Sequence, residues 1–196
     1  MIAQTKRGLR RELRAARAAL APHDRAARSA AVRMHLEALP QLTAASSIAA
    51  YAAAGTEVDL DPWLRRVLAR GATLALPVVL GEAVELAAVE DLGELVRGWR
   101  GLREPPPQAA RIRADAVDAA VVPGLGFDPH GGRLGQGGGH IDRLLAGLRS
   151  GVPVIGVAFG VQIVAAVPVE PHDVAVDLVV TEDGVLQGPP QRELPT

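Results

Sequence analysis

One stretch of the chain is dense in glycine and lies between an apolar run and a helical pattern. From Val121 to Arg143 it reads VVPGLGFDPHGGRLGQGGGHIDR. Glycine lets the backbone adopt positive φ and approach a ligand closely, and a helix N-terminus offers unpaired N–H groups with partial positive charge. The stretch therefore predicts a phosphate-binding loop followed by a helix that begins near His140. The alternative is a structural loop whose glycines only permit tight turns.

This loop matches neither of the two common glycine-rich nucleotide motifs. No Gly-Lys-Ser/Thr follows it, and Gly124-Leu125-Gly126 leads into a further loop instead of a helix. Asp142 follows the last glycines, and a carboxylate beside a bound phosphate is best explained by a divalent cation that removes their repulsion. We therefore predict a nucleotide or phosphate with a divalent cation. The alternative for Asp142 is an acidic residue favoured by the first turn of a helix.

The bulk composition bounds the class of protein. The 196 residues fit one domain covering 1–196, and the net charge of −1 gives no overall field that favours a polyanion. The absence of cysteine excludes disulfides, thiolate metal sites and a cysteine nucleophile. Two Trp, two Phe and one Tyr leave little aromatic surface for stacking on bases. With no long apolar run, we expect a cytoplasmic protein with no nucleic-acid or membrane partner.

Hydrophobic periodicity indicates strands that alternate with helices. Apolar residues recur at helical spacing over 5–20, and a second helix over 24–39 forms a helical hairpin with the first. Alternating elements of this kind predict an α/β fold, a three-layer α/β/α sandwich with a mostly parallel sheet. Strands are expected at 47–51, 73–79, 84–89, 118–123, 152–159 and 175–181, and further helices at 61–71, 92–99, 140–149 and 161–166.

Four basic residues form a stripe on the first predicted helix. They are Lys6, Arg10, Arg14 and Arg17, and Lys6 is the only lysine in the chain. A single lysine among many arginines is expected where a compact ammonium group is needed that a guanidinium cannot replace. The alternative is chance, and for most of the arginines we expect an ordinary solvated helix face.

Two more polar clusters follow predicted strands, Gly55-Thr56-Glu57 and the segment from Glu170 to Asp173. Ligands of parallel sheets bind outside the carboxyl ends of the strands, so these clusters and the glycine-rich loop can meet in one cleft. Singly, Glu57 is also compatible with a solvated loop residue, and Asp173 with a cap on the segment that enters the last strand.

The combination of these segments resembles the 5-formyltetrahydrofolate cyclo-ligase family. The resemblance begins with Lys6-Arg7-Gly8-Leu9-Arg10, continues through Glu57-Val58-Asp59, and is strongest in the PGLGFDxxGxRLGxGGG loop that ends at Asp142-Arg143. It extends to Asp173 and to Val179-Val180-Thr181-Glu182, and so covers nearly the whole chain in the order of the family.

The resemblance implies an α/β/α fold and an enzyme that uses ATP and Mg²⁺ to convert 5-formyltetrahydrofolate into 5,10-methenyltetrahydrofolate, with release of ADP and phosphate. It implies catalytic roles for Lys6, Arg10 and Glu57, and Mg²⁺ ligation by Asp142 and Asp173. The implied ATP site comprises Lys6, Arg10, Arg133, Leu134, Gly135, Gln136, Gly137, Gly138, Gly139, His140 and Ile141. The implied folate site comprises Ala52, Glu57, Gln136, Gly137, Gly138, Gly139 and His140. The expected partner is a reduced folate, and the protein itself is expected to be a monomer or a weak homodimer.

The chain departs from the family at one place. Two tyrosines usually precede the loop aspartate, whereas His140 and Ile141 stand there in this chain. His140 can still stack and form hydrogen bonds, but Ile141 offers only apolar contact. Two alternatives follow: a divergent homologue that binds ATP but acts on another formyl or pterin substrate, and a non-catalytic nucleotide-binding module.

Overall fold

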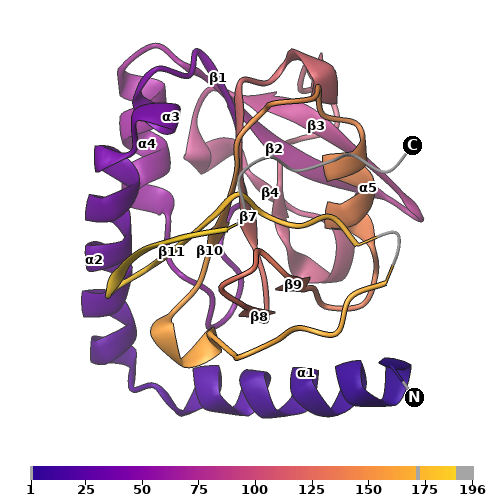
Figure 1. Ribbon diagram of the computed structural model, residues 1–196. Helices are drawn as coiled ribbons and strands as arrows, with labels where there is room; N and C mark the ends of the chain where they lie inside the picture. Colours follow the sequence, from indigo (N-terminus) through magenta and orange to yellow (C-terminus); the bar gives the residue numbers. More distant parts are fainter. Residues whose placement is uncertain (1, 171–172, 189–196) are drawn as a thin grey trace.

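The computed structural model describes residues 2–170 and 173–188, and its chain begins with two helices. Helix α1 spans Ile2–Ala19 and helix α2 spans Pro22–Ala38, with Pro22 in the first turn of α2. This position suits proline, whose missing N–H would have no partner there. The two helices predicted at the N-terminus are confirmed. Figure 1 shows that they meet at a corner, so that α1 runs below the sheet and α2 runs along one side of it.

An eight-stranded sheet has the order β12-β11-β10-β7-β1-β2-β3-β6. Its five middle strands are parallel, and antiparallel strands complete both edges. The middle strands are β1 (Ser47–Ala49), β2 (Thr73–Leu80), β7 (Ala119–Pro123), β10 (Val154–Val157) and β11 (Leu178–Thr181). The outer strands are β3 (Ala83–Val89), β6 (Arg111–Ile112) and β12 (Gly184–Gln187).

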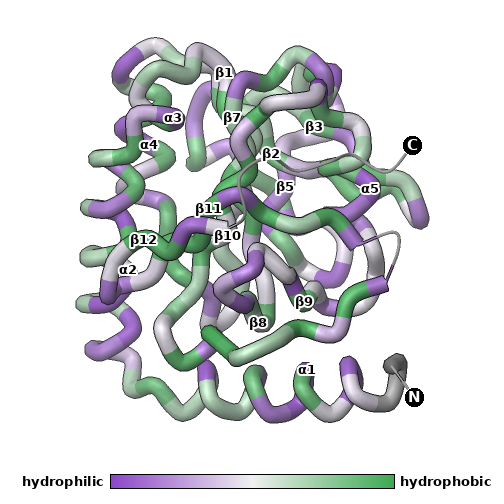
Figure 2. Tube along the Cα trace, viewed as in Figure 1, coloured by the Kyte–Doolittle hydropathy of each residue, from purple (hydrophilic) through white to green (hydrophobic). Residues whose placement is uncertain are grey.

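Helices cover both faces of this sheet. Helix α2, the short α3 (Pro40–Thr43) and α4 (Asp61–Ala69) bury Leu36, Leu42 and Leu64 against one face, whereas α5 (His140–Ala146) buries Leu144 and Leu145 against the other. The predicted three-layer α/β/α architecture is therefore confirmed. Figure 2 shows the hydrophobic residues concentrated along the central strands. Strands β10 and β11 are buried at every residue, as expected for parallel strands covered on both faces.

Two predicted helices are wrong. Residues 92–99 form a 3₁₀ turn η1 (Leu92–Glu94), strand β4 (Val96–Arg97) and the start of a second turn, η2 (Trp99–Gly101). Gly93 and Gly98 disfavour a helix here, and β4 pairs with β5 (Arg103–Glu104). Residues 161–166 form only the turn η4 (Gly160–Gln162), because the Val164 N–H donates to the Phe127 carbonyl instead of continuing a helix. A third turn, η3 (Ala114–Ala116), precedes β7.

The glycine-rich stretch contains a small hairpin that periodicity did not predict. Strands β8 (Gly126–Phe127) and β9 (Arg133–Leu134) pair antiparallel, and the Asp128 carboxylate accepts hydrogen bonds from the N–H groups of His130, Gly132 and Val167. These bonds fix the course of the loop after β7. Over residues 2–170 and 173–188, none of the helices combines the length and the apolar character that crossing a membrane requires.

Candidate functional site

Helix α1 lies across the carboxyl ends of the parallel strands (Figure 1). Its apolar side packs Leu13 into a small cluster with Leu134 of β9 and Val167, flanked by Leu9 and Val164. Leu13 approaches β8 so closely that a Cβ on Gly126 would lie 2.4 Å from a Leu13 methyl carbon. The amphipathic pattern thus anchors α1 on the loops after β7 and β10, and its basic stripe borders the same end of the sheet.

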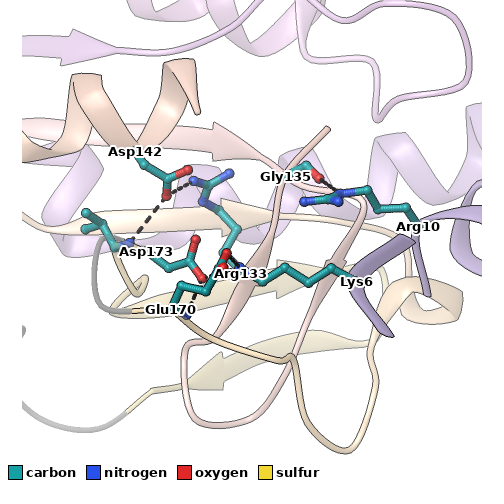
Figure 3. A network of polar contacts seen from close by, with 8 residues as sticks. Lys6, Arg10, Arg133, Gly135, Asp142, Glu170 and Asp173 are labelled. Carbon is teal, nitrogen blue, oxygen red and sulfur yellow. Dashed lines mark hydrogen bonds and ion pairs between the residues drawn. The ribbon is translucent and has the colours of Figure 1, made fainter. Parts of the chain in front are cut away.

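Lys6 links helix α1 to an acidic segment much later in the chain. Its Nζ donates to Oε2 of Glu170 at 2.7 Å and to Oδ2 of Asp173 at 2.6 Å, and Lys6 is only 5% exposed (Figure 3). Burial lowers the pKa of the ammonium, but the hydrogen bonds and charges of Asp173 and Glu170 outweigh this effect and raise the pKa overall. Lys6 therefore carries its full charge in this position at neutral pH.

The next members of the stripe contact the glycine-rich loop. Arg10 Nε donates to the Gly135 carbonyl at 2.9 Å, and an Arg14 Nη donates to the Gln136 side chain at 2.8 Å. These residues stand four apart, so one side of α1 presents both to the loop. The loop then enters α5 through Gly139, whose φ of +67° places it in the left-handed region that glycine favours.

Arg133 and Asp142 form an internal pair behind the loop. Arg133 is 4% exposed, and one of its terminal nitrogens donates to Oδ1 of Asp142, which also accepts the Val174 N–H at 3.3 Å (Figure 3). Within the described residues, the buried Arg133 Nε has no hydrogen-bond partner. The Arg133 guanidinium therefore orients Asp142 from the inside of the protein and does not face the exposed side of the loop.

A hydrogen bond links Asp142 to the neighbourhood of Asp173. The N–H of Val174, the residue after Asp173, donates to the Asp142 carboxylate. Asp173 also accepts the Glu170 N–H at 2.7 Å, so the capping role considered for it exists alongside its contact with Lys6. In the part of the chain that the structure describes, no group of three or more His, Cys, Asp or Glu side chains forms a ready metal cage. Two carboxylates suit Mg²⁺ nevertheless, because this ion usually takes one or two protein carboxylates and completes its shell with phosphate and water.

Glu57 lies in the loop after β1 and is not a solvated residue. Its side chain is 14% exposed, and Oε2 accepts the Ala54 N–H at 3.0 Å. Burial raises the pKa of Glu57, opposed in part by the Ala54 N–H and by the charge of Arg17. Ala52, five residues earlier, is buried in the core beside β1. A carboxylate held in a poorly solvated position can stabilise a cation that develops nearby more strongly than it could in water.

Three other predicted site residues, Leu134, His140 and Ile141, make contacts within the protein. The His140 ring contacts Trp99 edge to face, with centroids 4.9 Å apart, and its Nε2 lies 3.1 Å from the Gly81 carbonyl. That nitrogen must carry the hydrogen to bond a carbonyl. Ile141 packs against the core on the α5 side, and Leu134 is buried under α1. Only the backbone of Leu134 can therefore meet a ligand, and Trp99 is an aromatic neighbour of the loop that the sequence did not identify.

The expectation of a solvated face is wrong for Arg17. This residue is 5% exposed and contacts Thr56 and Glu57, so the fourth member of the basic stripe is buried against the loop after β1. The signal was present in the spacing, because Arg17 stands eleven residues after Lys6 and three helical turns bring both to nearly the same face. No pattern in the sequence, however, indicated what Arg17 would meet.

The fold and these contacts define a class of protein: an α/β sandwich with a charged site where one helix crosses the carboxyl ends of the parallel strands. The sequence pattern of the 5-formyltetrahydrofolate cyclo-ligase family matches residues 2–182. The chain belongs to this family, and the resemblance found in the sequence is confirmed. Cyclo-ligases are enzymes, which agrees with the predicted class.

Individual relatives give the same result. The chain is 35% identical over 142 residues to the 5-formyltetrahydrofolate cyclo-ligase of Mycolicibacterium smegmatis, covering 69% of this chain and 73% of that protein. It is 28% identical over 190 residues to the mouse 5-formyltetrahydrofolate cyclo-ligase, covering 91% and 94%. Among solved structures, the Aquifex aeolicus 5,10-methenyltetrahydrofolate synthetase superposes with a TM-score of 0.84 at 34% identity, covering 96% of this chain and 95% of that one.

Proposed function

We propose that the protein cyclises 5-formyltetrahydrofolate to 5,10-methenyltetrahydrofolate in a reaction that consumes ATP, requires Mg²⁺ and releases ADP and phosphate. The observation that carries the proposal is the contact of Lys6 with Asp173 beside the contact of Arg10 with the glycine-rich loop. One helix thereby brings Arg10 to the glycine-rich loop and Lys6 to Asp173. Family membership and the names of the relatives support the choice of substrate.

The chemistry needs activation of a formyl oxygen. The oxygen of an N-formyl amide is a poor leaving group, and ATP supplies the phosphoryl group that converts it into phosphate. The N10 nitrogen of the same substrate then forms a bond to the formyl carbon, loses its proton, and phosphate leaves with the former formyl oxygen. No protein nucleophile is required, so the enzyme contributes positioning and electrostatic stabilisation.

The residues present fit an Mg²⁺ ion and a triphosphate. Asp142 and Asp173 would provide carboxylate oxygens to the ion, and Arg133 fixes the orientation of Asp142. Lys6, Arg10 and the N–H groups of residues 135–139 would hold phosphate oxygens. Lys6 pairs with both Asp173 and Glu170. We expect its ammonium to exchange these carboxylates for phosphate oxygens when the nucleotide and the ion bind.

The folate would occupy the space between the loop and the segment after β1. Glu57 would stabilise the iminium-like cation that forms when the formyl oxygen is phosphorylated. Ala52 and residues 136–140 would contact the pterin. His140, which contacts Trp99 edge to face, keeps an aromatic ring where the family usually has a tyrosine. This contact favours a working folate site over the alternative of a module that has lost it.

The test combines purified protein, ATP, Mg²⁺ and 5-formyltetrahydrofolate, and follows the ultraviolet absorbance of the methenyl product. We expect turnover that stops when ATP or Mg²⁺ is omitted. No turnover at high enzyme concentration contradicts the proposal. Calorimetry then separates the alternatives: binding of ATP without any folate indicates a nucleotide-binding module, whereas binding of other pterins indicates a different substrate.

A further inference from the structure

Arg17 and Lys6 are the two buried members of the basic stripe, each 5% exposed. Arg17 lies near the C-terminal end of α1, and its Nε donates to Thr56 Oγ1 at 3.0 Å. One of its terminal nitrogens lies 3.9 Å from Oε1 of Glu57. Both contacts join α1 to the loop after β1, and Thr56 stands 39 residues after Arg17 in the sequence. Arg17 is therefore the link between the helix and the loop that carries the carboxylate.

Burial of this guanidinium is costly, and the contacts that offset the cost point to Glu57. Burial lowers the pKa of Arg17, and the charge of Glu57 is the largest opposing influence. A buried arginine is retained where its charge or its planar set of donors is used, since an apolar residue of similar size would fill the space without this cost. The contacts indicate that Arg17 holds the Thr56-Glu57 segment in position.

The electrostatic surroundings of Glu57 involve few other groups. Arg17 comes from α1 and the Ala54 N–H from the loop itself. The Tyr51 hydroxyl, which donates to the Val58 carbonyl at 3.3 Å, has its pKa raised well above its usual value by burial and by the charge of Glu57. The charge of Arg14 lowers the pKa of Arg17, and the charge of Asp59 raises the pKa of Tyr51. Arg17 is the only cation among these neighbours that acts on Glu57 directly in the described chain.

We propose that Arg17 is a positioning residue for Glu57: its hydrogen bond to Thr56 and its ion pair with Glu57 tie the loop after β1 to α1 and hold the carboxylate in place for the reaction. This inference rests on the proposed function, because it assigns to Glu57 the stabilisation of the cationic formyl group. It also explains the long helix, which carries Lys6 and Arg10 at the phosphate end of the site and Arg17 at the pterin end. Between Lys6 and Arg17, α1 rises by about 16 Å.

The experiment measures the pH profile of kcat/KM for 5-formyltetrahydrofolate in Arg17→Met, Arg17→Lys and Thr56→Val, from about pH 5.5 to about pH 9. Without the guanidinium, burial acts on Glu57 with less opposition, its pKa rises further, and more of it is protonated at low pH. Arg17→Met should therefore lose roughly tenfold or more in kcat/KM on the acid side and recover as the pH rises. Arg17→Lys should keep most of the wild-type kcat/KM at low pH, because the positive charge beside Glu57 remains.

Thr56→Val separates the hydrogen bond from the charge. It removes the partner of Arg17 Nε but leaves the cation beside Glu57, so we expect a raised KM with an unchanged pH profile. The matched control is Arg11→Met, an exposed arginine of the same helix, which should behave as wild type. An equal loss at every pH in Arg17→Met, or a profile of Arg17→Lys identical to that of Arg17→Met, overturns the proposal.

A second measurement does not depend on turnover. The carboxyl carbon of Glu57 in isotope-labelled protein can be titrated by NMR, with Arg17→Gln, which also removes the charge, used in the same way if Arg17→Met folds poorly. The Glu57 pKa must be higher in Arg17→Met than in wild type, and an unchanged titration contradicts the inference even if the enzyme is active. If the wild type does not cyclise the substrate but the Glu57 pKa still rises in Arg17→Met, the proposed function is contradicted and the positioning inference is not. The two failures are therefore distinguishable.

Discussion

The ammonium of Lys6 lies 2.6 Å from the carboxylate of Asp173, a residue 167 positions later in the chain. Lys6 also bonds Glu170, and both acidic residues precede the last parallel strand β11. The contact closes the site around helix α1, because the opposite end of that helix meets the loop after β1. A single element thus connects three segments that are far apart in sequence.

Lys6→Ala should abolish activity or raise the KM for ATP by roughly tenfold or more, since a charge-assisted contact to phosphate contributes about 1.5–3 kcal/mol. Lys6→Arg should rescue only weakly, because a planar guanidinium cannot take the place of a compact ammonium between two carboxylates. Steady-state kinetics with varied ATP test this. Arg7→Ala, at an exposed neighbouring position, is the control. An unaffected rate in Lys6→Ala would remove Lys6 from the site.

Asp142→Asn and Asp173→Asn should each raise the Mg²⁺ concentration needed for half-maximal activity by about tenfold or more, because a neutral amide binds a hard cation more weakly than a carboxylate. Asp142→Asn should also lower the free energy of unfolding by about 2 kcal/mol, since it leaves the buried charge of Arg133 without its partner. Activity against total Mg²⁺ and chemical denaturation provide the measurements. Asp115→Asn, which breaks an exposed pair with Arg113, should change neither.

Gly131→Ala and Gly71→Ala compare two glycines with nearly the same φ. Their φ values are +79° and +78°, but a Cβ on Gly131 would lie 2.3 Å from the Val176 carbonyl oxygen, whereas nothing lies within 4 Å at Gly71. Gly71→Ala should cost about 1 kcal/mol for the strained conformation alone. Gly131→Ala should cost about 2 kcal/mol more, because backbone must shift next to the segment that carries Asp173. Equal destabilisation of the two variants in urea would refute this comparison.

The pair of Asp61 and Arg103 predicts a pH-dependent contribution to stability. Two hydrogen bonds of 2.7 and 2.8 Å join them, and these bonds, more than any other influence, lower the pKa of Asp61. A lowered carboxyl pKa stabilises the fold above the ordinary range of Asp and loses this effect as the pH falls through the folded value. Because both side chains are partly exposed, we expect only about 0.5–1 kcal/mol.

Asp61→Asn should therefore lower Tm by a few degrees at about pH 7, and the difference from wild type should shrink as the pH falls below the ordinary range of Asp. Arg103→Met should give the same pattern, since it removes the same interaction. A difference in Tm that persists undiminished in acid would show that Asp61 acts through something other than its charge, such as its place in the first turn of α4.

The strongly periodic parts of the sequence were sufficient to predict the architecture. The helical spacing of Leu9, Leu13, Ala16 and Leu20 predicted α1, and the unbroken apolar runs before Gly124 and at Val154 predicted buried parallel strands. Predictions failed where pairing partners decide the conformation. The residues of β4 pair with β5, and those after η4 bond to β8, so local helical tendency was overridden by contacts that a periodic pattern does not contain.

The sequence by itself determined the chemistry available to this protein: one lysine, a glycine-rich loop before a helix, and aspartates in two separate segments. Residue type sets charge, donor geometry and backbone freedom, and these are properties of each residue that need no neighbours. The tertiary structure alone decided which charges meet, because burial and distance govern the strength of electrostatic interactions. It placed Arg17 against Glu57, turned Arg133 inward to Asp142 and brought Lys6 to Asp173. None of these pairings follows from spacing along the chain.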